Sequence, residues 1–185
     1  MTQESTENAV KRSLADVPNG PIRDRLLSSI NLLDNYTRGW VAEVIVAEAL
    51  HATMVGDGYG DWDLELDGKR IEVKASGDIQ AWPQKNRSII TFGIAQTEGY
   101  VEQADGSYIA DTEKRRRSDV YVFAHHKGTI PDDPTEWEFY VVATAQVDRE
   151  CGDQKTIGLV PLARRFRVEP VGVDQLRSAV LKLQN

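Results

Sequence analysis

The sequence predicts a single domain of the mixed α/β (α+β) class, built around one central mixed β-sheet with flanking helices. The chain has 185 residues, which fits one domain. Hydrophobic residues make up 41% and charged residues 28%, which is ordinary for a globular protein. Segments with helical periodicity precede and follow a run of strand-like segments. We expect a flexible N-terminal tail over residues 1–20 and the domain itself over residues 21–185.

Two helices are expected ahead of the sheet and one after it. Pro21 suits the first position of a helix, and apolar residues then recur at spacings of four, four and three, at Ile22, Leu26, Ile30 and Leu33. A second helix is expected over residues 38–50, where almost every side is apolar. Residues 56–60 are rich in glycine and mark a loop. Near the end of the chain, residues 174–184 have the pattern of a third helix.

Five segments between these helices have the pattern of strands, and they cover residues 62–66, 69–75, 88–94, 119–125 and 137–144. Asp67-Gly68 separates the first two and is a strong signal for a two-residue hairpin turn. A smaller hairpin is expected around Asp105-Gly106, with arms at residues 100–104 and 107–110.

The first hairpin brings acidic and basic side chains to one face. With a two-residue turn, facing residues have numbers that sum to 135, so Glu65 faces Arg70 and Asp63 faces Glu72. The first pair can form an ion pair, but like charges directly across a ladder destabilise it. A divalent cation between Asp63 and Glu72 would offset that cost, because Mg²⁺ takes hard oxygen ligands and keeps several waters.

Two more residues extend this acidic pair into a chemical site. Lys74 lies on the same strand face, where an ammonium group can hold a water or stabilise charge developing on a phosphate. Glu43 lies in an apolar stripe of the second helix, where a carboxylate should not face a dry core. We expect Glu43 to point at the same site, and Glu48, on a different side of the helix, is the weaker candidate. The alternative for Glu43 is a salt bridge to Arg38 or Arg70. Paired acids, a lysine and a metal suit phosphodiester hydrolysis.

These residues resemble a known signature. Asp63, followed after eight residues by Glu72-Val73-Lys74, resembles the motif of the PD-(D/E)XK nuclease superfamily, and a helix with Glu43 ahead of the hairpin matches its usual order. Further stretches are similar to a widespread bacterial family of mostly uncharacterised nuclease-like proteins, namely residues 62–64, 70–76, 80–82, 119–123 and 137–140. The resemblance covers roughly residues 37–145.

The resemblance implies a restriction-endonuclease-like fold and a Mg²⁺-dependent DNA endonuclease, in which Mn²⁺ can replace Mg²⁺. Asp63 and Glu72 would be metal ligands, Lys74 the catalytic lysine, and Glu43 an accessory ligand. The proline of the signature is absent, and Asp61 is a rival for the aspartate role because the register puts it opposite Lys74. Duplex or branched DNA would be the substrate, a homodimer is expected, and restriction, phage defence or repair would be the setting.

Residues outside the motif are expected to contact DNA. The resemblance implies that Ser76 and Gln80 touch the substrate backbone, whereas we expect Trp82 to pack rather than stack on bases. Residues 114–117 form a basic block that precedes the strand at 119–125. Together with the smaller hairpin, this block would form an arm over DNA. Its phosphate-binding residues would be Arg115, Arg116 and Arg117. The alternative for this block is a solvated surface.

Composition narrows the remaining classes. The net charge of −7 argues against a general nucleic-acid binder, although a basic face can coexist with an acidic total. The single cysteine, Cys151, excludes an intrachain disulfide and a thiolate-rich metal site. The sequence has no signal peptide and no run of the ~20 apolar residues that a membrane span needs, so we expect a soluble, cytoplasmic protein without a membrane partner. The alternative function is a catalytically inactive module of the same fold that binds nucleic acid or a protein partner.

Overall fold

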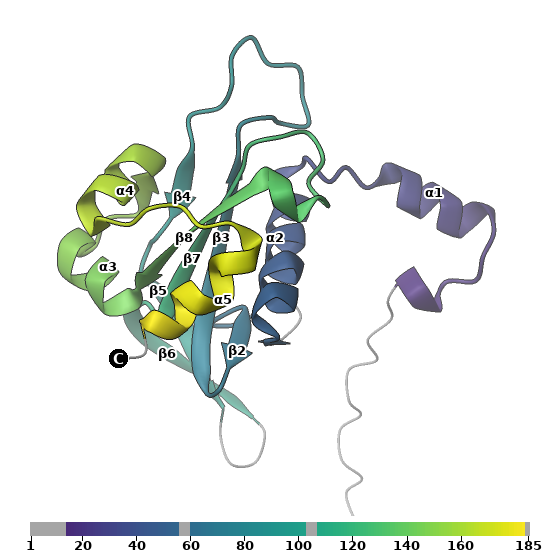
Figure 1. Cartoon of the computed structure of the whole chain (residues 1–185). Coiled ribbons are helices and arrows are strands. Elements are labelled where there is room, and N and C mark those ends of the chain that lie inside the picture. Colours follow the sequence, from purple (N-terminus) through teal and green to yellow (C-terminus); the bar gives the residue numbers. More distant parts are fainter. Residues whose placement is uncertain (1–13, 56–59, 103–106, 184–185) are drawn as a thin grey trace, which may run out of the picture. The chain divides into compact units, whose positions relative to one another are not determined.

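Figure 1 shows the protein as a computed structural model, which describes residues 14–55, 60–102 and 107–183. The chain divides between Asn31 and Leu32 into two compact units, whereas the sequence led us to expect a boundary at residue 20. The first unit carries a short 3₁₀ helix, η1 (Leu14–Asp16), and helix α1 (Pro21–Ser29). Helix α1 buries none of its residues, so the apolar stripe predicted there packs into no core.

The second unit has a mixed α/β (α+β) architecture, as the sequence predicted. Its elements in chain order are α2 (Asn35–Leu50), β1 (Thr53–Met54), β2 (Leu64–Leu66), β3 (Lys69–Gly77), β4 (Thr91–Gly93), β5 (Thr97–Glu102), β6 (Tyr108–Arg115), β7 (Val120–His126), η2 (Pro134–Glu136), β8 (Trp137–Ala143), α3 (Thr144–Cys151), β9 (Thr156–Gly158), α4 (Leu159–Phe166) and α5 (Val173–Lys182). None of the helices in the described ranges combines the length and the apolar character that crossing a membrane requires.

The main sheet is mixed and has five strands in the order β1-β2-β3-β7-β8. Strands β3 and β7 are parallel, and the other neighbours are antiparallel. The predicted hairpin register is confirmed, since Glu65 pairs with Arg70 across β2 and β3. Asp67 and Gly68 both have positive φ angles, 51° and 77°, as a type I′ turn requires.

Alternation along β3 divides the core into two layers. Ile71 and Val73 belong to a cluster that also takes in the buried faces of α2 and α5. The opposite side of the sheet carries Tyr121 and Phe123, which pack with residues of α3, α4 and β9. Figure 1 shows α5 and α2 against one side of the sheet, with α3 and α4 grouped together at its edge.

Several boundaries differ from the sequence prediction. Helix α2 begins three residues early, because Asp34 caps it and accepts a hydrogen bond from the Tyr36 N–H at 3.0 Å. The strand expected at 88–94 is reduced to β4, which pairs with β9. The sequence analysis missed β1, β9, α3 and α4. Helix α3 buries Val147 and Cys151, four residues apart, and this short helical spacing was the available signal.

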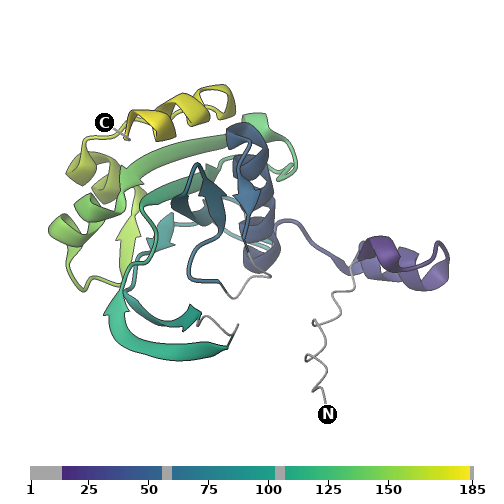
Figure 2. The same cartoon turned by 90° about the horizontal axis from the view of Figure 1, so that it is seen from below.

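The smaller predicted hairpin is present and longer than expected. Strands β5 and β6 pair antiparallel, with Tyr100 opposite Ala110 and Thr97 opposite Arg115. Figure 2 shows this two-stranded ribbon curving beside the main sheet. The expected turn at Asp105-Gly106 and most of the glycine-rich segment at 56–60 lie outside the described residues.

Candidate functional site

The predicted acidic pair and its lysine meet at the middle of β3. Glu72 and Lys74 lie on the same face of the strand, and the Lys74 ammonium group forms an ion pair with Glu72 Oε1. Asp63 lies just before β2, in a bend rather than in the strand we expected there. Its backbone N–H donates to the Ile71 carbonyl at 3.0 Å. Its carboxylate Oδ2 accepts a hydrogen bond from the Val73 N–H at 2.7 Å, which fixes it against the same strand.

Helix α2 adds the third carboxylate. Glu43 is half-buried, whereas Glu48 is exposed, in agreement with the sequence analysis. Burial, and to a lesser extent the negative charge of Asp63, raises the pKa of Glu43 to about 7, although Lys74 opposes this rise. Glu43 therefore lies within electrostatic range of the residues on β3.

The two arginines considered as partners of Glu43 bind elsewhere. Arg38 is buried, and its guanidinium group donates to the Asn35 side chain at 3.0 Å and the Leu33 carbonyl at 2.6 Å. Arg70 forms a bidentate pair with Asp119, with distances of 2.8 and 3.1 Å. The ion pair expected between Arg70 and Glu65 is thus replaced by one to Asp119, because β7 runs beside β3 and presents that carboxylate.

The charges of the site are unbalanced. Burial raises the pKa of Glu72 to about 6; Lys74 opposes this rise and Asp63 adds to it. Burial also raises the pKa of Asp63, although the Val73 N–H and Lys74 both favour its charged form. Burial alone would lower the pKa of Lys74, but Glu72 and the other carboxylates outweigh it and hold the ammonium charged. Three carboxylates share one lysine, which leaves negative potential for a cation to neutralise.

A cavity of about 220 Å³ adjoins this cluster. Glu72 and Lys74 form part of its wall, together with residues from the neighbouring strands and loops, namely Asp61, Gly93, Ala95, Thr97, Arg116, Arg117 and Tyr121. Because a water molecule takes up about 30 Å³ in the liquid, the cavity has room for several waters or for a charged group with part of its hydration shell.

The structure separates the roles of Asp61 and Asp63. Asp61 forms an ion pair with Arg117 at 3.3 Å, so its charge is already compensated. Asp63 accepts the Val73 N–H through Oδ2, and among the described residues no salt bridge to its carboxylate is found. This difference favours Asp63 over Asp61 as the partner of Glu72.

The donor set suits a hard cation that keeps its waters. In the described ranges, no group of three or more His, Cys, Asp and Glu side chains is arranged to hold a metal ion. Mg²⁺, however, commonly uses one or two carboxylates and takes its other ligands from water and substrate phosphates. Asp63 and Glu72 provide two such carboxylates and Glu43 lies within electrostatic range, so the chemistry of the residues fits Mg²⁺ or Mn²⁺.

The basic block was expected to contact DNA along its whole length, but only part of it is exposed to solvent. Arg115 is exposed, as a DNA-contacting residue must be. Arg116 and Arg117 are buried, which corrects the expectation of a continuous solvated arm. Arg116 donates to the Ile94 carbonyl at 2.8 Å and pairs with Asp148 at 2.7 Å.

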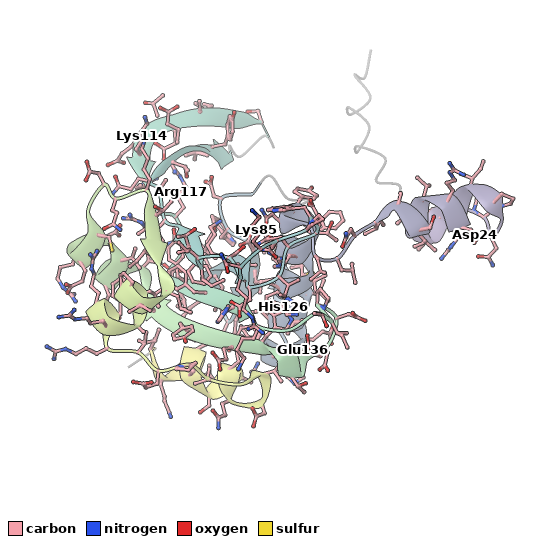
Figure 3. The ribbon with its side chains drawn as sticks, turned by 90° about the horizontal axis from the view of Figure 1, so that it is seen from above. Asp24, Lys85, Lys114, Arg117, His126 and Glu136 are labelled. Atoms are coloured by element: carbon pink, nitrogen blue, oxygen red, sulfur yellow. The ribbon has the colours of Figure 1, made fainter. Side chains whose placement is uncertain are left out.

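Arg117 fastens the base of the hairpin to the candidate site. Besides its pair with Asp61, it binds Asp111 of β6 at 3.0 Å and donates to the Glu113 carbonyl at 2.9 Å. Figure 3 shows Arg117 and Lys114 at the end of the hairpin that joins the rest of the unit. Contact of Arg116 or Arg117 with a phosphate would have to compete with these bonds, because their guanidinium N–H groups already have acceptors.

The loop after β3 contains the other expected contact residues. Gln80 accepts a hydrogen bond from Arg38 at 3.2 Å and donates to the Gly77 carbonyl and Ser88 Oγ, both at 2.9 Å. It therefore braces the loop. Ser76 is half-buried on β3, beside His125 in the register. Trp82 is 53% exposed, so our expectation that it packs inside the protein was wrong.

The sequence analysis considered Arg38 only as a partner of Glu43 and missed its observed role. Arg38 joins α2 to the end of β3, where a side chain on Gly77 would put its Cβ 2.8 Å from the Arg38 guanidinium carbon. A buried arginine within a helix leaves no periodic signal, so only the missing side chain at Gly77 hinted at a close approach. No protein-family model matches the chain, and no curated protein matches it.

We predict unequal losses of stability for neighbouring arginines of the basic block. Arg116→Ala removes a fully buried guanidinium group and leaves buried carbonyls without donors, which costs roughly 2–4 kcal/mol of unfolding free energy. Arg115→Ala removes an exposed group and should change the unfolding free energy by less than about 0.5 kcal/mol. Urea unfolding of the purified variants measures both. Equal losses in the two variants would contradict the placement of these side chains.

The raised pKa of Glu43 predicts a pH-dependent cost. The folded protein holds a proton on Glu43 up to about pH 7, whereas the unfolded chain releases it near pH 4.5, so stability falls as the pH rises between these values. Glu43→Gln removes this cost. In EDTA, the variant should be more stable than wild type at pH 8, by a margin that shrinks at pH 5.

Thermal unfolding at the two pH values tests this prediction. The matched control is Glu48→Gln, an exposed glutamate on the same helix, which should show the same margin at both pH values. A Glu43→Gln margin independent of pH would mean that neither burial nor the neighbouring charges raise the pKa of this carboxylate.

Proposed function

We propose that this protein is a Mg²⁺-dependent DNA endonuclease that hydrolyses phosphodiester bonds on a restriction-endonuclease-like fold. One observation carries the proposal: three carboxylates with raised pKa values lie within electrostatic range of a single charged lysine, beside a cavity with room for several waters. A purely structural cluster would gain stability by pairing or losing these charges. A site for a divalent cation and a phosphate needs the surplus of negative charge and the lysine together.

Asp63 and Glu72 are the residues that would hold the cation. When bound, Mg²⁺ would neutralise phosphate charge and lower the pKa of a coordinated water. Asp63 is positioned for this task by the Val73 N–H, which orients its carboxylate from the adjacent strand. Glu72 faces the cavity in which a phosphate group would lie.

Lys74 and Glu43 would have different catalytic roles, which follow from their charge states. Lys74 stays protonated, since the surrounding carboxylates raise its pKa, so it acts as a donor to a phosphate oxygen or to the attacking water. Glu43, with a pKa of about 7, can hold a proton close to neutrality and is the residue suited to accept one from that water. The ion pair between Lys74 and Glu72 would open when substrate and cation enter.

The proposal also covers the substrate, the cellular compartment and the oligomeric form. DNA is the proposed substrate, the cytoplasm the proposed compartment, and a homodimer the proposed form for cutting both strands. Exposed Arg115, at the base of the β5–β6 hairpin, is proposed to contact a phosphate in exchange for its ion pairs with Asp111 and Glu113.

Divalent cations should stabilise the protein through the two acidic ligands. At 5 mM Mg²⁺ and pH 8, the wild-type melting temperature should rise by a few degrees, because a ligand at ten times its Kd adds about 1.4 kcal/mol. Asp63→Asn and Glu72→Gln should lose this rise. Differential scanning fluorimetry, with and without Mg²⁺, measures it.

The matched control for this shift is Glu65→Gln, an exposed acid on the same hairpin, which should keep the full rise. If all variants respond to Mg²⁺ as wild type does, the cation binds elsewhere on the acidic surface and the proposed ligands are wrong.

Cleavage itself is tested with supercoiled plasmid in Mg²⁺, Mn²⁺ or EDTA. We expect metal-dependent nicking or linearisation. Lys74→Ala and Glu72→Ala should slow it by about 100-fold or more, the usual loss when one charge-stabilising group is removed. Lys182→Ala, which changes an exposed lysine on α5, should cleave at the wild-type rate.

Three outcomes would count against the enzyme. Cleavage that persists in both variants would come from a contaminating nuclease. DNA binding without any cleavage, with all three metal conditions tried, would support the inactive nucleic-acid-binding module instead. A protein that neither binds nor cleaves DNA would point to a domain that binds a protein partner.

A further inference from the structure

Helix α2 presents aromatic side chains to solvent. Tyr36 is 70% exposed and Trp40 52% exposed, and their rings lie 5.6 Å apart. Exposed Val44 continues the same stripe, because residues four apart share one side of a helix. The opposite side of α2 is fully used in the core, so these rings are surplus to folding. Large aromatic groups left exposed together commonly mark a binding surface.

This stripe borders the candidate site. Glu43 follows Trp40 by three residues, and residues at this spacing are neighbours on a helix surface, with a rise of about 4.5 Å between them. Glu43 in turn senses the charges of Asp63 and Lys74. A molecule lying on the two rings would therefore reach the carboxylate cluster within one helical turn.

A third exposed ring lies on the loop between β3 and β4. Trp82 belongs to this loop and is 53% exposed. The base of the loop is held to α2 by Arg38, which donates to the Ile79 carbonyl and to Gln80. Figure 1 shows the loop extending beyond the end of the sheet at which α2 begins. The loop and the first turns of α2 therefore form one end of the unit.

The same loop carries positive charge. Lys85 is exposed, and Figure 3 labels it on this loop. Arg87 is also largely exposed and pairs with Asp78 at 2.7 Å. The loop that carries Trp82 thus also carries two exposed basic side chains, in a protein whose net charge is −7. Proteins bind single-stranded nucleic acid by stacking bases on aromatic rings and by pairing basic side chains with phosphates.

We infer that Tyr36, Trp40 and Trp82 form a stacking platform for unpaired bases, and that the DNA substrate enters the site through a single-stranded stretch. This inference rests on the proposed nuclease function and names its substrate class. In a duplex the bases cover one another's faces, so side chains reach only their edges and the backbone. The platform offers flat rings rather than groove-reading donors, which selects strands whose base faces are free.

Binding is measured without cleavage, in EDTA, with the full chain. The probes are a fluorescein-labelled 20-nucleotide single strand of mixed sequence and the duplex of the same sequence. Fluorescence anisotropy should show the single strand bound at least about tenfold more tightly than the duplex. Trp40→Ala should weaken single-strand binding about 5- to 150-fold, the usual loss for one stacked base. Trp40→Phe should keep most of the affinity, because it keeps a ring.

The controls separate stacking from folding and from catalysis. Val160→Ala changes an exposed apolar residue on α4 and should bind as wild type does. Circular dichroism and melting temperature confirm that each variant folds. Wild-type preference for the duplex, or unchanged single-strand binding in Trp40→Ala, would overturn the platform whatever the plasmid assay shows.

The opposite result is equally informative. If single-strand binding depends on Trp40 but neither plasmid nor single strands are cleaved, the platform is supported and the nuclease function is refuted. If Trp40→Ala changes only the sedimentation of the protein and leaves DNA binding intact, the rings contact a second copy of the chain and the inference fails.

Discussion

The alternation of side chains along β3 is the constraint on which the rest of this structure depends. The strand lies inside the sheet, so its apolar residues Ile71 and Val73 must enter the core beneath α2. The intervening residues Glu72 and Lys74 are then forced to the other face, among aromatic residues such as Tyr121. One strand thus serves both folding and the candidate chemistry, and a slip of one residue in its register would destroy both.

This arrangement carries an electrostatic cost that the fold does not relieve. Glu43, Asp63 and Glu72 approach one ammonium group, and burial raises the pKa of each carboxylate. Elsewhere in the described chain, an acidic side chain of low exposure is neutralised by arginine, as Asp111 is by Arg115 and Arg117. The contrast within one molecule shows that compensation was structurally available. A site that keeps its surplus negative charge is suited to receive a cation rather than merely to persist.

The sequence predicted the local part of this site well, because the information was local. An Asp-Gly turn fixed the register of the hairpin as far as Leu64, and Asp63, just before β2, binds the Val73 N–H next to Glu72. Helical periodicity separated Glu43 from Glu48. What it did not predict came from contacts distant in sequence, such as Arg116 passing into the interior to reach Asp148. A run of four basic residues looks the same whether its side chains enter the protein or solvent.

Long-range arginine contacts also explain how peripheral segments are held near the centre. Arg38 ties the β3–β4 loop to α2, and Arg117 ties the β5–β6 hairpin to Asp61 beside the cavity. Both side chains use several donors at once, which lets one residue fix an irregular backbone that no sheet ladder could hold. These contacts fix the bases of the loop and the hairpin, while outer side chains such as Trp82 remain exposed. Such an arrangement allows a surface for binding to vary without disturbing the charged strand beneath it.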